Sequence, residues 1–220
     1  MTASVEPMIY QGQFGEFTIT QDDRRGVVIY RSGLMVAALS FAIGVGLVLW
    51  QSHNPVVVQL LTPLYTVFWL GLAVSLLTIH IYLEPLHRAL QAFLLVGGVA
   101  SLAIAHLSPE PFAQTVYSNP LTIFGVGFTF VALTGIYFKE AFCFNRLETK
   151  ALTPIVPTLL IGHLVGLLPL AVEQMLLASW AILFLVFAVR KVMQPIPPDI
   201  GDKSVFDYLH QQRQNQAKLP

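Results

Sequence analysis

The sequence has little charge, a single cysteine and no excess of basic residues. Only 11% of its 220 residues are Asp, Glu, Lys or Arg, whereas about 25% is typical of soluble domains. Twelve basic residues balance twelve acidic ones, so nothing in the charge suggests a nucleic-acid partner. Cys143 stands alone and cannot form an intramolecular disulfide. This composition argues against a protein that is soluble in water.

Short motifs of the common enzyme classes are also missing. The sequence contains no Walker loop, no dinucleotide-binding glycine pattern, no His-Glu-x-x-His and no cysteine pair for zinc or iron–sulfur ligation. We therefore expect no cofactor and no metal, and we expect the chain to act without covalent chemistry.

Long apolar runs dominate instead, and 55% of the residues are hydrophobic. A helix needs about 20 residues to cross a hydrocarbon core of about 30 Å. Six runs have this length or come close to it: 32–50, 64–83, 89–107, 120–138, 153–169 and 175–189. They predict an all-α, polytopic membrane helix bundle with six transmembrane helices, of which the last two are slightly short.

The twelve Lys and Arg residues sort onto one side of this bundle. They lie before the first span, between the second and third, between the fourth and fifth, and after the sixth. The other three loops contain none, so the positive-inside rule predicts that both termini are cytoplasmic, or lie in the equivalent compartment of an internal membrane. The first 25 residues are polar and lack the apolar core of a cleaved signal peptide.

This topology divides the chain into three parts. Residues 1–25 form an N-terminal cytoplasmic segment, residues 26–192 the membrane domain, and residues 193–220 a proline-containing linker with a short tail helix. Thr20 and the acids after it resemble a helix start. Pro63 and Pro154 are expected at the first turns of the second and fifth spans, where proline costs no hydrogen bond.

A polar inner turn contains His80, Glu84, His87 and Arg88. On a continuous helix these spacings would place the side chains on one face, and Glu-x-x-His is half of a di-iron carboxylate motif. Pro85 disfavours that helix, and no second Glu-x-x-His occurs. We interpret the cluster as a solvated turn rather than a metal site.

His163 is the ionisable residue placed deepest in a predicted span, which makes it a candidate intramembrane polar site together with Glu173. The residues around His163 resemble the catalytic-histidine helix of rhomboid proteases. The Gly-x-Ser-Gly nucleophile motif of those enzymes is missing. We expect a neutral histidine hydrogen-bonded to a neighbouring helix. A proton path that begins at Glu173 is the alternative.

The segment between the fourth and fifth spans is dense in charged and aromatic residues. It offers a candidate partner surface, because aromatic and Arg side chains often anchor interfaces. The alternative is an amphipathic helix extension whose phenylalanines face lipid. The candidate surface consists of Lys139, Glu140, Phe142, Phe144, Arg146 and Glu148.

Three strings, 10–17, 29–34 and 139–148, carry a resemblance that extends over most of residues 10–190. The chain resembles an uncharacterised family of integral membrane proteins of cyanobacteria and plastids, a domain of unknown function. The resemblance implies a thylakoid or plasma membrane with the basic face in cytoplasm or stroma. It implies no activity for any residue.

These observations predict an accessory or assembly factor of a larger, photosynthetic membrane complex. Its partners would be membrane lipid and that complex, and not nucleic acid. The competing class is a small transporter or channel. Such a protein needs polar residues along a path, and the spans offer few beyond Gln91 and His163.

Overall fold

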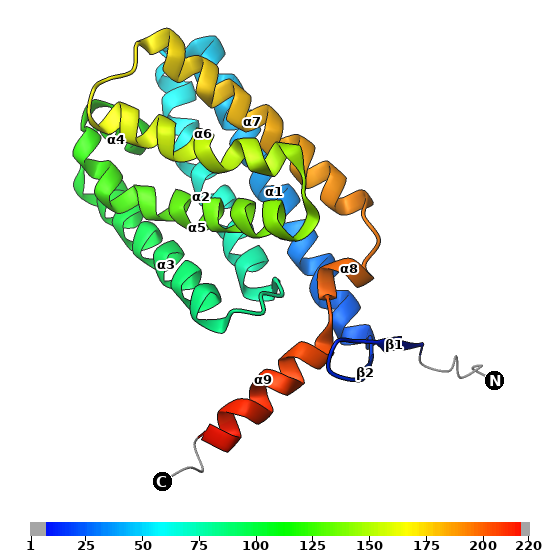
Figure 1. Cartoon of the computed structure of the whole chain (residues 1–220). Coiled ribbons are helices and arrows are strands. Elements are labelled where there is room, and N and C mark those ends of the chain that lie inside the picture. The colour runs from blue at the N-terminus through cyan, green and yellow to red at the C-terminus, as the bar shows by residue number, and fades with distance from the viewer. Residues whose placement is uncertain (1–7, 217–220) are drawn as a thin grey trace, which may run out of the picture.

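Five helices of the computed structural model are long and apolar enough to cross a membrane. The model describes residues 8–216, without the side chains of Arg213, Asn215 and Gln216. The five are α1 (Gln21–Gln51), α2 (Pro55–Thr78), α3 (Glu84–Leu107), α5 (Ile123–Phe144) with the 3-10 turn η1 (Pro120–Thr122) before it, and α7 (Leu170–Met193). They pack side by side in one bundle (Figure 1). The prediction of a helical membrane protein is confirmed at this level.

Helix α6 (Leu147–Leu164) occupies the place of the fifth predicted span and is not among these five. The sequence predicted a span over 153–169 that opened at Pro154. The helix instead begins six residues earlier and contains Pro154 and Pro157. It ends before Gly166, which has a positive φ of 65°, outside the range of a right-handed helix. Prolines are tolerated inside membrane helices because neighbouring groups form hydrogen bonds with the carbonyls that proline leaves without an N–H donor.

The limits of α1 and α2 test two further expectations. Thr20 caps α1 through a reciprocal bond with Asp23, as the sequence predicted. Asn54 caps α2, which runs from Pro55 to Thr78 rather than over 64–83, with Pro63 inside the helix. The prediction that Pro63 opens this span was therefore wrong.

Close helix contacts and large aromatic side chains fill the interior of the bundle. Gly33 and Gly71 let α1 and α2 approach, because a Cβ on Gly33 would lie 2.6 Å from the Gly71 carbonyl oxygen. Phe184 is fully buried, and Trp180 donates from Nε1 to the Tyr137 hydroxyl at 3.2 Å. Such packing fills the centre of the bundle with apolar and aromatic side chains.

A small polar module sits at one end of the bundle, here called the tail end. It comprises the hairpin of β1 (Ile9–Gln11) and β2 (Glu16–Thr18), the short α8 (Pro197–Ile200), and α9 (Lys203–Gln216). We refer to these elements as the tail module. Helix α9 projects away from the bundle (Figure 1). A short α4 (Phe112–Ser118), which the sequence did not predict, lies between α3 and α5.

Candidate functional site

Four charged side chains form a buried ionic quartet at the tail end: Arg31, Glu140, Lys191 and Asp199. The Lys191 ammonium lies 2.5 Å from a Glu140 oxygen and 2.5 Å from an Asp199 oxygen. Arg31 approaches the other Asp199 oxygen to 2.6 Å. Two cations and two anions balance, and the side chains are at most 7% exposed.

Further donors and an aromatic ring complete the quartet. Lys139 lies 2.9 Å from the second Glu140 oxygen, and the Tyr30 hydroxyl donates to the same oxygen at 3.2 Å. Arg31 also donates to the Gln194 carbonyl at 2.6 Å. The Lys191 ammonium lies 4.0 Å from the centre of the Phe144 ring, which is a cation–π distance.

The quartet connects α1, α5, α7 and α8, which lie far apart in the sequence. A buried charge that loses its partner destabilises a fold strongly, so the quartet fixes the tail module on the bundle. Sequence reasoning did not single out Arg31, Lys191 or Asp199. The available signal was Lys191, a charge at the end of an apolar run, but its partner Glu140 lies 51 residues away. Asp199, its other partner, lies on α8, beyond the end of the membrane helix.

A second ionic group lies beside the quartet, at the start of α6. Arg190 donates to a Glu148 oxygen at 2.8 Å, and Arg146 lies 3.7 Å from the other Glu148 oxygen. Arg146 also bonds the Gln194 side chain. Glu148 is 4% exposed at its side chain, although Arg190 is half exposed.

These contacts place the predicted partner surface as follows. Lys139, Glu140 and Glu148 point into the protein, and Phe144 lies against Lys191. Phe142 is 82% exposed on the last turn of α5. The predicted loop is therefore mostly helix, and most of its charged side chains face the protein, whereas Phe142, Cys143 and Leu147 are exposed. Its role in docking stays a prediction.

The other predicted polar pair comes together at the opposite end of the bundle. Nδ1 of His163 on α6 lies 2.7 Å from a Glu173 oxygen on α7. Nε2 of His163 lies 3.2 Å from the Tyr117 carbonyl oxygen on α4, and the two rings stack at 5.0 Å. The Tyr117 hydroxyl donates to Glu173 at 3.4 Å. Partial burial and the Glu173 charge raise the pKa of Tyr117.

Both ring nitrogens of His163 thus face acceptors. A neutral imidazole can donate to only one of them, whereas an imidazolium donates to both. The structure contains the predicted contacts of His163 with neighbouring helices, since α4 and α7 supply the partners of its two ring nitrogens. The site joins α4, α6 and α7.

The polar inner turn divides into two parts. Glu84 and Arg88 form an ion pair within the first turns of α3, and His87 reaches the Leu76 carbonyl oxygen at 2.6 Å. His80 precedes the helix and lies toward α1. Burial lowers the pKa of His80, with a smaller opposing effect of Asp23. Within residues 8–216, no three His, Cys, Asp or Glu side chains come together in a way that could hold a metal ion.

One polar contact crosses the middle of the bundle. The Tyr65 hydroxyl on α2 lies 2.7 Å from the Ser101 hydroxyl on α3 and 2.9 Å from that of Thr129 on α5. Phe112 and Phe130 pack around the Tyr65 ring. The Tyr65 hydroxyl thus hydrogen-bonds those of Ser101 and Thr129 and joins three helices; we call this group the hydroxyl clasp.

Apolar helices of membrane length, with charges gathered at the helix ends, define an integral membrane protein. A family model described as an uncharacterised integral membrane protein (DUF2301) matches residues 74–208, more than half of the chain. The chain belongs to this family. Neither the curated proteins nor the solved structures contain a significant match.

Proposed function

We propose that the chain is a six-pass accessory or assembly factor of a larger membrane complex, with both termini in the cytoplasm. It would act by binding, through the tail module. The observation that carries this proposal is that the tail module is held in place and projects from the bundle. The polar groups inside the bundle form hydrogen bonds and ion pairs with one another.

The ends of α6 support the sixth pass. Glu148, at the start of α6, bonds Arg190 at the end of α7, while His163, at the end of α6, bonds Glu173 at the start of α7. At 1.5 Å per residue the 18-residue helix is about 27 Å long, close to the thickness of the hydrocarbon core. An even number of passes brings both described chain ends to the tail end (Figure 1).

The sidedness follows from charge. The Lys and Arg residues from Arg24 to Lys203 lie on helix segments that meet at the tail end or on the tail module. The loops at the opposite end contain no Lys or Arg. By the positive-inside rule the tail end faces the cytoplasm. The resemblance to cyanobacterial and plastid proteins favours a thylakoid or plasma membrane and a photosynthetic complex.

The tail module is built as a rigid platform. The Gln13 amide donates to Asp202 at 2.6 Å, and the Phe14 ring stacks on Tyr208 at 4.0 Å. A bond from Ser204 lowers the pKa of Asp202 and keeps this carboxylate charged. Phe14 nevertheless stays 47% exposed. An ordered, partly exposed aromatic pair is typical of an interface anchor.

A transporter remains the second candidate because of the hydroxyl clasp at Tyr65. Transport needs a hydrated path, and the aromatic rings around this clasp disfavour one. Within the described chain, the polar groups at the two ends are separated by this apolar packing.

Co-migration with a complex tests the proposal. A tagged full-length chain, solubilised from native membranes in mild detergent, should migrate on a native gel above its own mass. Phe14→Ala with Tyr208→Ala should shift it to the mass of the free protein, whereas the control Phe124→Ala, at an exposed aromatic residue near the start of α5, should not. Wild-type protein that migrates alone would overturn the assembly role.

A further inference from the structure

Two crevices follow one face of α3. The first, of about 210 Å³, lies at the tail end between the α2–α3 turn and α9, and its lining includes Tyr82, Glu84, His87, Phe206 and His210. The second, of about 170 Å³, lies between α2 and α3 within the membrane span. Its lining includes Trp69, Ala73, Leu76, Leu77, Gln91 and Leu94. Each crevice is smaller than the volume of about 300 Å³ at which small-molecule sites begin, and the two volumes together exceed this limit.

His87 lines the tail-end crevice, and Gln91 lines the second crevice. Glu84, His87, Gln91 and Leu94 follow one another at spacings of three or four residues, which places them on one stripe of the helix. The Gln91 amide lies 3.2 Å from His87 Nε2, between the polar and the apolar crevice. A molecule that occupies both must therefore be polar at one end and apolar at the other.

The tail-end crevice suits an uncharged, hydroxylated group. Tyr82 and Phe206 pack at 4.8 Å and form an aromatic wall. Two imidazoles, a phenol and a carboxylate can exchange hydrogen bonds with hydroxyls. Among the described residues, no Lys or Arg is part of this lining, and these are the side chains that bind a phosphate most strongly.

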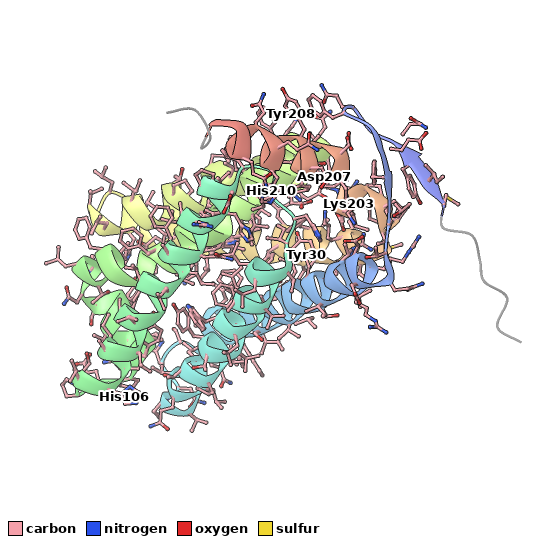
Figure 2. All side chains as sticks on the ribbon, turned by 90° about the horizontal axis from the view of Figure 1, so that it is seen from below. Tyr30, His106, Lys203, Asp207, Tyr208 and His210 are labelled. Carbon is pink, nitrogen blue, oxygen red and sulfur yellow. The ribbon has the colours of Figure 1, made fainter. Side chains whose placement is uncertain are left out.

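Helix α9 closes this crevice over the membrane surface. Figure 2 places His210 on α9 beside the tail-end elements, far from His106 at the other end of α3. The Tyr82 hydroxyl accepts a bond from the Asp202 amide at 2.5 Å and keeps its own hydrogen to donate. The position is that of a lipid head group.

The groove below is apolar and open to the bilayer. Leu77 is 69% exposed and Leu95 is 63% exposed at its edges. Trp69 donates its indole N–H to the Leu94 carbonyl oxygen at 3.1 Å and so presents only its rings. An alkyl chain is the apolar group that such a groove accommodates.

We propose that α2, α3 and α9 bind a lipid with an uncharged, hydroxyl-bearing head group. The head lies against Tyr82, His87 and His210, and one alkyl chain lies along Ala73. An alkyl chain gains no hydrophobic free energy when it moves from other lipid tails into the groove. The choice of one lipid over another therefore depends on the head group. The site does not depend on the assembly role.

Native mass spectrometry of the full-length protein in detergent tests this site. The probes are a glucosyl diacylglycerol and a phosphatidylglycerol with the same acyl chains. We expect retained adducts with the glucolipid and about tenfold weaker binding to Ala73→Phe, which fills the groove. Ala103→Phe, on the exposed face of α3 away from the groove, is the matched control and should bind like wild type.

The head group is tested separately through the tail helix. His210→Ala should weaken glucolipid binding about threefold, the scale of one hydrogen bond in membrane proteins, whereas Gln214→Ala should leave it unchanged. His210 lies on the surface, so this test holds even where Ala73→Phe fails to fold. Equal or stronger binding of phosphatidylglycerol would overturn the proposal, and so would wild-type affinity in His210→Ala.

Discussion

His163 on α6 and Glu173 on α7 form an ion pair at the end of the bundle opposite to the tail module, with 2.7 Å between Nδ1 and the carboxylate oxygen. Both side chains are less than one-fifth exposed. Because Tyr117 stacks on the imidazole, the pair also holds α4 in place. At the tail end the Glu140–Lys191 pair has the corresponding role for α5 and α7.

The first prediction concerns His163. His163→Leu removes both of its bonds and leaves Glu173 half-buried without its cation, so we expect a loss of about 1 kcal/mol or more in unfolding free energy. His163→Asn retains a donor and should lose less. Thermal unfolding in detergent gives the comparison. A loss of growth phenotype in both variants, with unchanged stability, would instead indicate a proton-carrying role.

A second prediction concerns the ionic quartet. Lys191→Met leaves two buried carboxylates with one cation fewer, which should cost about 3–5 kcal/mol. Adding Glu140→Gln removes one of these charges, so the double variant should be less destabilised than the two single losses added together. Denaturant unfolding of the four proteins measures the coupling. Strict additivity would show that the pair does not act as a unit.

The third prediction is a pH dependence at the α2–α3 turn. Burial lowers the pKa of His80 below its ordinary 6.5, so the folded protein favours the neutral ring. As the pH falls below about 6.5 the unfolded chain takes up this proton first, and stability decreases. His80→Gln should be less sensitive between pH 7 and pH 5. His80 also faces the charges of Asp23, Asp199, Lys139 and Lys203. Equal sensitivity of the two proteins would show that His80 does not cause the loss of stability.

Hydropathy predicted the membrane helices better than it predicted their limits. The sequence placed the end of α3 at Leu107, where the structure has it, but predicted its start at residue 89 rather than at Glu84. It misplaced the starts of α2 and α6, because Pro63 and Pro154 were interpreted as first-turn residues. In a bundle, neighbouring helices compensate for a missing N–H, and no local pattern in the sequence shows this compensation.

The candidate sites, too, were predicted only in part. His163 and Glu173 were paired from the sequence, since ten residues joined by a tight turn bring two antiparallel helices together. Arg31 and Asp199 are 168 residues apart, and only the packing of four helices joins them. For the same reason, Glu140 read as a surface charge in the sequence but lies in the core.

The central claim is a six-pass topology with the tail module on the basic, cytoplasmic face. It is tested with a membrane-impermeant maleimide in intact cells that carry the protein in the plasma membrane, because Cys143 is exposed. Cys143→Ser provides the background for Glu110→Cys, at the opposite end, and for Gln211→Cys, on α9. We predict that Glu110→Cys labels at once, whereas native Cys143 and Gln211→Cys label only after permeabilisation. Immediate labelling of Gln211→Cys would show five passes, and labelling of Glu110→Cys only after permeabilisation would contradict the orientation.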